Sequence, residues 1–208
     1  RPTAGNCASV SSSPNSNFVA FMLNSGEVFE VMDVTTGGVV AVLKAPEIPG
    51  QSARHTENVH AVGCSPDGKS LIVVTNRIHR YAVTTTGIQH AEMSEPVIGG
   101  TSAVSFSADS RRLLVHGHDL VRVFETNRLA TPLHKLEIQT QDDVVLDPSG
   151  EFVWANQFAG DQMTELAKLD LTGEAQLQLK LDPSDDVLVF APGGKRLFFG
   201  EVLVDLGN

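Results

Sequence analysis

The residues best suited to metal chemistry in this chain stand together in the segment His116-Gly117-His118-Asp119. Side chains two residues apart on a strand share a face, so His116 and His118 could converge on one cation, with Asp119 as a third or supporting ligand. The competing interpretation is a turn between strands in which Asp119 accepts hydrogen bonds from backbone amides. We predict no bound metal and no other cofactor, and keep these three residues as the candidate ligands.

Acid–base chemistry has its candidates in two carboxylate pairs, Asp142-Asp143 and Asp185-Asp186. Paired carboxylates can act as general acid and base when their environments separate their pKa values. Each pair stands a few residues before one of five similar turn segments in the sequence. The residue six positions before the second residue of each turn segment is polar in four of the five cases. These four residues are His60, Ser102, Asp142 and Asp186. We predict that these four residues form a rim that binds a partner. The alternative is that they only belong to solvated loops.

No familiar catalytic motif accompanies these residues. The sequence has no Gly-x-Ser-x-Gly nucleophile turn, no Gly-Lys-Ser phosphate loop and no His-Glu-x-x-His zinc motif. Pro192-Gly193-Gly194-Lys195 resembles part of a phosphate loop, but it falls in a repeated turn position and predicts a hairpin turn. We therefore predict no catalytic residue and a protein that is not an enzyme.

The elements that position these side chains follow from an internal repeat. Five turn phrases recur along the chain, and their second residues are Pro14, Pro66, Ala108, Pro148 and Pro192. These anchor residues are 40 to 52 residues apart. A period of about 40–45 residues with strand and turn signals is typical of four-stranded propeller blades.

The residues around each anchor predict four strands per repeat. Before the turn, apolar residues recur at every second position, so one face of the first strand is apolar. After the turn comes a nearly continuous apolar segment, such as Leu71 to Val74 or Leu113 to Val115, which is typical of a strand buried on both faces. A third strand ends in a turn rich in Thr and Gly, and a more polar fourth strand suits an outer edge. No segment predicts a helix.

The predicted fold is an all-β β-propeller of four-stranded antiparallel blades, with about five repeats. Their approximate bounds are 6–50, 55–95, 98–138, 140–181 and 184–208. Residues 1–208 form either a single propeller domain or a partial propeller, and five repeats also fit a part of a seven-bladed ring.

The segments around the recurring turns and in the third strands resemble those of the WD-repeat family. The segment from His55 to Val59, with Val62 to Lys69 after it, is similar to the family's opening histidine, first strand and turn. The segment from His118 to Glu125 resembles its third strand, with Phe124-Glu125 where Trp-Asp would stand. No repeat keeps a Trp-Asp pair, so the repeats are diverged. The resemblance implies a propeller that presents its loops to partner proteins.

The overall charge argues against two classes of partner. The formal net charge is −10 at pH 7, and no run of Lys and Arg is longer than two residues. Nucleic-acid binding needs a basic surface, and a membrane span needs about 20 apolar residues in a row, so we expect neither direct nucleic-acid binding nor membrane insertion. Cys7 and Cys64 are expected as buried apolar side chains without a disulfide framework, in an intracellular, cytoplasmic protein.

Two functions remain at the level of sequence. The first is a non-enzymatic protein–protein interaction scaffold within a multi-subunit complex, which presents propeller loops and the channel mouth to partner proteins. The alternative is a propeller enzyme, or a module that binds a small ligand or metal, which uses acidic and histidine residues at the channel mouth.

Overall fold

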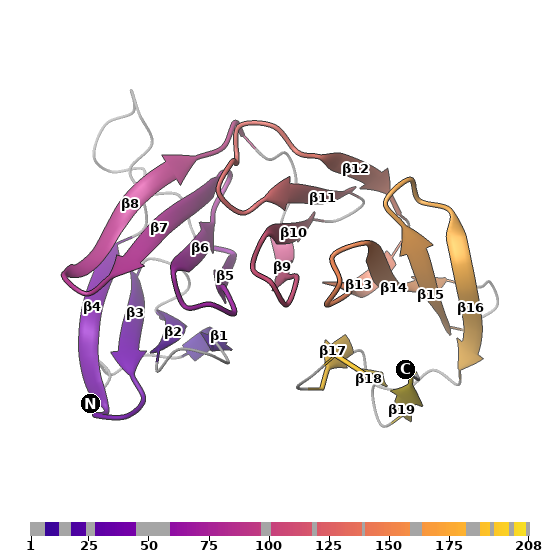
Figure 1. Ribbon diagram of the computed structural model, residues 1–208, viewed down its shortest axis with the longest axis horizontal. Coiled ribbons are helices and arrows are strands. Elements are labelled where there is room, and N and C mark those ends of the chain that lie inside the picture. Colours follow the sequence, from indigo (N-terminus) through magenta and orange to yellow (C-terminus); the bar gives the residue numbers. More distant parts are fainter. Residues whose placement is uncertain are drawn as a thin grey trace. The chain divides into compact units, whose positions relative to one another are not determined.

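The computed structural model contains strands and no helix in the residues that it describes. These are 7–12, 18–23, 28–44, 59–96, 101–117, 120–138, 140–158, 164–181, 188–191, 194–199 and 202–206. Their strands form five antiparallel sheets, four of four strands and one of three, and in each sheet the strands lie in chain order (Figure 1). The predicted all-β fold and its four-stranded antiparallel blades are confirmed.

The chain folds as two compact units. The first, Arg1–Thr101 with Arg128–Thr131, holds two sheets. Their strands are β1 (Cys7–Ser12), β2 (Phe18–Leu23), β3 (Val28–Asp33) and β4 (Gly38–Lys44), then β5 (Ala61–Cys64), β6 (Ser70–Val74), β7 (Ile78–Thr84) and β8 (Gly87–Met93).

The second unit, Ser102–Asn127 with Pro132–Asn208, holds three sheets. The first contains β9 (Thr101–Phe106), β10 (Arg112–Gly117), β11 (Leu120–Glu125) and β12 (His134–Glu137). The second contains β13 (Thr140–Leu146), β14 (Phe152–Phe158), β15 (Thr164–Asp170) and β16 (Ala175–Leu181). The third contains β17 (Leu188–Phe190), β18 (Arg196–Phe199) and β19 (Val202–Asp205). Each sheet thus lies within one of the predicted repeats. Thr101, the first residue of β9, is the one strand residue assigned to the other unit.

The turn between the first and second strands uses the same hydrogen bonds in two sheets. Between β5 and β6, the Ser65 hydroxyl donates to Asp67 Oδ1 at 2.6 Å and accepts from the Ser70 amide at 2.9 Å. Between β9 and β10, Ser107 donates to Asp109 at 2.7 Å and accepts from the Arg112 amide at 2.9 Å. The hydrogen bond from Ser107 lowers the pKa of the Asp109 carboxyl. The recurring phrase therefore encodes a closed hydrogen-bonded turn.

The second strands β6, β10 and β14 are strongly buried, as their apolar runs predict. Leu71, Ile72, Val73 and Val74 of β6 are at most 1% exposed, and Leu113, Leu114 and Val115 of β10 are fully buried. The outer fourth strands β4, β8 and β16 are largely exposed instead. A strand buried on both faces needs an apolar neighbour on each side, so the sheets within a unit must pack face to face.

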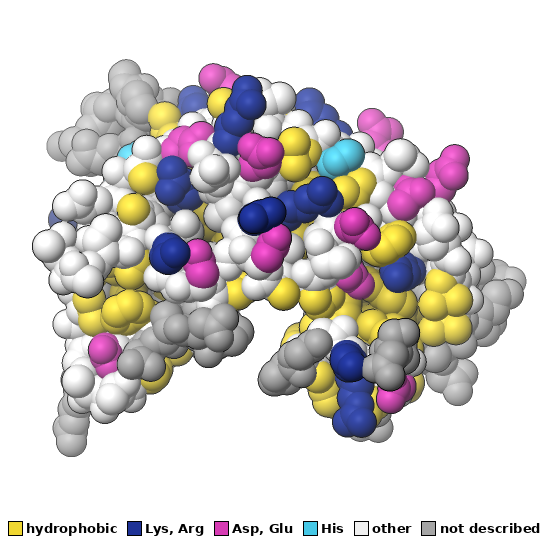
Figure 2. All heavy atoms as spheres, in the orientation of Figure 1, with side chains coloured by type: hydrophobic (Ala, Val, Ile, Leu, Met, Phe, Trp, Pro, Cys, Tyr) yellow, Lys and Arg dark blue, Asp and Glu magenta, His cyan; other side chains and the backbone are white. Residues whose placement is uncertain are grey.

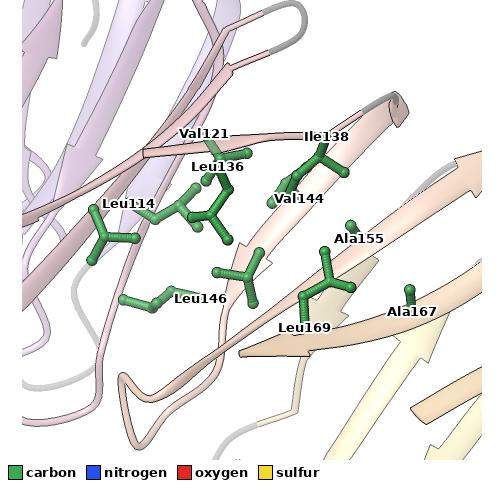
Figure 3. Packing of buried hydrophobic residues seen from close by; sticks show 11 residues of the cluster. Leu114, Val121, Leu136, Ile138, Val144, Leu146, Ala155, Ala167 and Leu169 are labelled. Carbon is green, nitrogen blue, oxygen red and sulfur yellow. The ribbon is translucent and has the colours of Figure 1, made fainter. Parts of the chain in front are cut away.

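Apolar side chains of consecutive sheets form the cores. In the first unit, Ala20 and Phe29 pack with Val62, Leu71 and Tyr81 of the following sheet. In the second unit, one cluster joins sheets β9–β12 and β13–β16 through Leu114, Val121, Val123, Leu136, Ile138, Val144, Leu146, Val153, Ala155, Ala167 and Leu169 (Figure 3). Another joins β13–β16 to β17–β19 through Trp154, Leu166, Leu188 and Leu197. Each large aliphatic side chain buried in this way stabilises the fold by about 1.5–3 kcal/mol.

The repeated turns of the second unit also contact one another. The Ala108 amide donates to the Pro148 carbonyl oxygen at 2.8 Å, which joins the turn of one sheet to that of the next. Gly194, in the turn of the following sheet, lies against the Pro148 ring with φ +72°. A Cβ on Gly194 would stand 2.6 Å from Pro148 Cγ. Glycine is therefore required at this position both for its backbone conformation and for the close approach.

Replacing Gly194 by alanine tests this contact. Gly194→Ala adds the strain of a positive φ and a clash with Pro148, whereas Gly173→Ala, at φ +92° in the same unit, meets nothing closer than Leu136 Cδ2 at 3.7 Å. We expect Gly173→Ala to cost about 1 kcal/mol and Gly194→Ala roughly 1–3 kcal/mol more, in thermal or urea unfolding. Equal losses in the two variants would contradict the close packing of these turns.

Candidate functional site

The predicted rim residues stand at the beginnings of first strands where the structure describes them. His60 is exposed and precedes β5, with its amide bonded to the Val74 carbonyl oxygen at 2.7 Å. Ser102 lies in β9 and Asp142 in β13, whereas Asp186 lies outside the described residues. His60 belongs to the first unit and the two strand residues to the second. Partner binding by this column stays a prediction.

The candidate metal ligands are only partly described. His116 lies in β10, 2% exposed, with Val121 of β11 as its cross-strand neighbour. His118 and Asp119 lie outside the described residues. Among the residues that are described, no group of three or more His, Cys, Asp or Glu side chains could hold a metal ion.

A buried amide occupies the strand end opposite Asp142. Asn156 of β14 is fully buried, yet neither its Oδ1 nor its Nδ2 has a hydrogen-bond partner in the described part of the chain. The pairs Thr140–Gln157 and Val144–Ala155 enclose three residues of β13, with Asp142 in the middle, and these stand opposite Asn156 alone. Leaving such an amide unbonded costs about 1–3 kcal/mol. Irregular pairing of this kind is frequent beside functional sites, where it redirects side chains.

Sequence analysis missed Asn156, although a signal for it was present. Asn156 stands eight residues after its anchor Pro148, and His116 stands eight residues after its anchor Ala108. Both come directly after the apolar run of a second strand, so a polar residue at this position could have marked the same strand end in two sheets. The structure shows that both side chains are buried there.

The first unit has a polar chain at the corresponding end of its second sheet. Thr75 follows β6, and its hydroxyl lies 3.2 Å from His79 Nε2. The other ring nitrogen of His79, Nδ1, lies 3.3 Å from Nε2 of His90 in β8. His79 is 2% exposed and His90 is exposed, so these contacts link a buried hydroxyl to the surface. Which ring nitrogen donates in each of these contacts depends on the tautomer of each imidazole, and a chain of this kind can pass a proton from one group to the next.

The Cys64 thiol of the first unit is poorly suited to act as a nucleophile. Burial raises the pKa of Cys64 to about 11, although hydrogen bonds with Ala20 and Ser11 act in the opposite direction. The thiolate is the reactive form, so Cys64 behaves as a small apolar core residue, as the sequence suggested. Acid–base chemistry in this unit is therefore left to imidazole and carboxylate groups.

Two solved structures resemble this chain in fold. The hydrazine synthase of Kuenenia stuttgartiensis matches with a TM-score of 0.68 and 18% sequence identity, over 90% of this chain and 53% of that one. A Bacteroides fragilis protein assigned as a 6-phosphogluconolactonase matches with a TM-score of 0.59 and 17% identity, over 87% of this chain and 59% of that one. The chain thus spans between half and three fifths of their lengths. No protein-family model and no curated protein matches it.

These matches correct the predicted function. The sequence predicted a non-enzymatic scaffold, but the solved structures with a similar fold include a synthase and an assigned lactonase. The scaffold prediction relied on missing motifs, and propeller enzymes assemble their sites from several strand ends, which no short motif records. The β-propeller fold is supported. Among the described residues, no helix is long and apolar enough to cross a membrane.

The reactivity of Cys64 tests its burial. In a Cys7→Ser variant at pH 8, we expect Cys64 to react with a disulfide reagent about 100-fold more slowly in the folded protein than after unfolding, because the raised pKa lowers the thiolate fraction. The fold favours the protonated thiol, so this contribution to stability is present below the ordinary thiol pKa of 9.0 and is lost as pH rises towards about 11. Rapid labelling of the folded variant would contradict a buried thiol.

Proposed function

We propose that this chain is a propeller of the enzyme type that binds a small polar ligand at the strand ends of its second unit. Asn156 and His116 supply buried polar groups, and Ser102 of β9 and Asp142 of β13 are the rim residues that the proposal adds to them. Asp142 and His116 are the side chains whose chemistry suits general acid–base catalysis. The observation that carries the proposal is the buried, unbonded amide of Asn156 opposite Asp142.

The kind of ligand follows from what such an amide can recognise. An Asn side chain donates two hydrogen bonds and accepts up to two, which matches hydroxyl and carbonyl groups. A ligand with these groups would satisfy the amide and recover the cost of its burial. The assigned lactonase among the similar structures supports a lactone or sugar as the first class to test.

We also propose that the blades are diverged repeats of the WD type. Support comes from the quoted histidine and third-strand phrases and from the shared turn chemistry of Ser65 with Asp67 and of Ser107 with Asp109. The phrase Phe124-Glu125 stands where the family has Trp-Asp, and Phe124 is 2% exposed, so the aromatic position keeps its place in the core.

Ligand binding at Asn156 can be tested directly. Sugars, sugar lactones and divalent cations are screened for an increase in Tm and for lactone hydrolysis. A productive ligand should stabilise the wild-type protein, and Asn156→Leu should abolish its effect while folding at least as well without ligand, because an unbonded amide is replaced by an apolar side chain of similar size.

The matched control is Asn127→Leu, an exposed asparagine of the same unit. We expect this variant to keep the response to ligand. A response that survives Asn156→Leu, or no response from any of the three ligand classes, would contradict the proposal.

A further inference from the structure

One arginine in the second unit has a buried guanidinium nitrogen and no partner. Arg122 lies in β11, and its Nη1 is buried without a hydrogen bond in the described part of the chain. Burial also lowers the pKa of this guanidinium, and no neighbouring charge contributes to that shift. The other strand arginines that the structure describes each have an acceptor: Arg80 with Glu92, Arg112 with the Gly150 carbonyl oxygen and Arg196 with Asp205. Arg80 also has a buried nitrogen, Nε, without a hydrogen bond, but its Nη2 lies 3.5 Å from Glu92 Oε2.

A second cation lies directly across from it. Arg122 pairs with Lys135 of β12, so two positive side chains occupy neighbouring positions on one face of the sheet. Like charges directly opposite one another on a sheet are destabilising. Glu137 lies two residues along β12 from Lys135, on the same face, but the described structure gives it no ion pair with Arg122. Within the described residues, no acidic side chain pairs with Arg122.

The packing of the sheet does not require an arginine here. Arg122 pairs with Val115 of β10. Val115 stands seven residues after Ala108, the anchor of its repeat. In the next sheet, Ala167 pairs with Ala155, also seven residues after its anchor, and both alanines are fully buried. A small apolar residue thus serves at the equivalent position. An arginine with a buried, unbonded nitrogen costs stability that a ligand of opposite charge would recover.

We propose that Arg122 and Lys135 form a binding site for a small oxyanion, such as the phosphate or carboxylate group of a metabolite. The planar guanidinium fork matches two oxygens of such a group, and the Lys135 ammonium adds a flexible point charge from the neighbouring strand. Arg122 is only partly buried, and Lys135 is exposed, so an anion can reach the pair from solvent. Lys and Arg side chains reach the surface over the sheet β9–β12 (Figure 2).

This site goes beyond the proposed function, because it relies on β11 and β12 and not on the strand end at Asn156. It specifies that the protein binds an anion although its formal net charge is −10. Such a charge repels anions at long range, so binding must come from direct contacts with the two cations.

The experiment titrates inorganic phosphate into the full chain at constant ionic strength, with calorimetry and Tm as readouts. Acetate in a parallel titration distinguishes a carboxylate from a phosphate preference. We expect phosphate or acetate to bind and to raise the Tm of the wild-type protein. Arg122→Met should weaken that binding at least about 10-fold, as loss of a charge-assisted bidentate contact does. Lys135→Met should weaken it less.

The Tm without anion separates a ligand-binding arginine from a structural one. Because Arg122 Nη1 has no hydrogen-bond partner among the described residues, Arg122→Met should unfold at the same temperature as the wild-type protein or higher. The control Arg111→Met removes an exposed arginine that lies 3.7 Å from Asp109, and it should keep the anion response. Arg122→Lys, which keeps the charge and loses the fork, should fold and bind phosphate more weakly.

Three results would overturn the proposal. The first is an Arg122→Met protein with a clearly lower Tm and an unchanged anion response, which would make the arginine structural. The second is a Glu137→Gln protein that loses stability, since Glu137 would then be the partner of Arg122 in solution. The third is the absence of any effect of phosphate or acetate beyond that of sodium chloride at equal ionic strength.

Discussion

The structure depends on one constraint, which is that apolar second strands such as β6, β10 and β14 must be covered on both faces. Strands such as β6 and β10 carry apolar side chains at nearly every position, and a single four-stranded sheet leaves both of its faces open. The constraint is met when the face of one sheet packs on the next, as Leu114 does against Val144 and Leu146. The first and third strands contribute to these cores, and the fourth strands β4, β8 and β16 stay largely outside them.

The turns at one end of the sheets keep this packing in register. In the second unit they contact each other through the Ala108 amide, the Pro148 ring and carbonyl group, and the backbone of Gly194. Once neighbouring sheets are fixed at this end, their opposite strand ends fall at corresponding positions. Residues an equal distance from their anchors, such as His116 and Asn156, therefore occupy equivalent places in successive sheets. A repeat in the sequence becomes a repeated set of positions available for chemistry.

Both proposals start from polar atoms that the fold leaves unbonded at a cost. Asn156 lies among some of the most buried side chains of the unit, and Arg122 holds a charge beside another of the same sign. Neither residue is needed for packing, since apolar residues serve at equivalent positions, such as Val74 in β6 and Ala167 in β15. A stable, repetitive core can tolerate the unfavourable free energy of a few unbonded polar groups. A ligand that forms hydrogen bonds with such a group gains more binding free energy than it would at a group that is already bonded.

The sequence by itself determined the repeat, the four-stranded blade and the buried second strand, because these follow from local alternation, apolar runs and turn chemistry. It also placed Ser102 and Asp142 just ahead of first strands, whereas the structure has both residues within those strands. It did not reveal that Asn156 lacks a partner, that three residues of β13 stand opposite it, or that Arg122 faces Lys135 across β11 and β12. Those facts depend on pairing between strands and on packing between sheets. The chemistry of this protein is therefore decided by tertiary structure, since hydrogen-bond satisfaction and the distances between charges are properties of the folded chain.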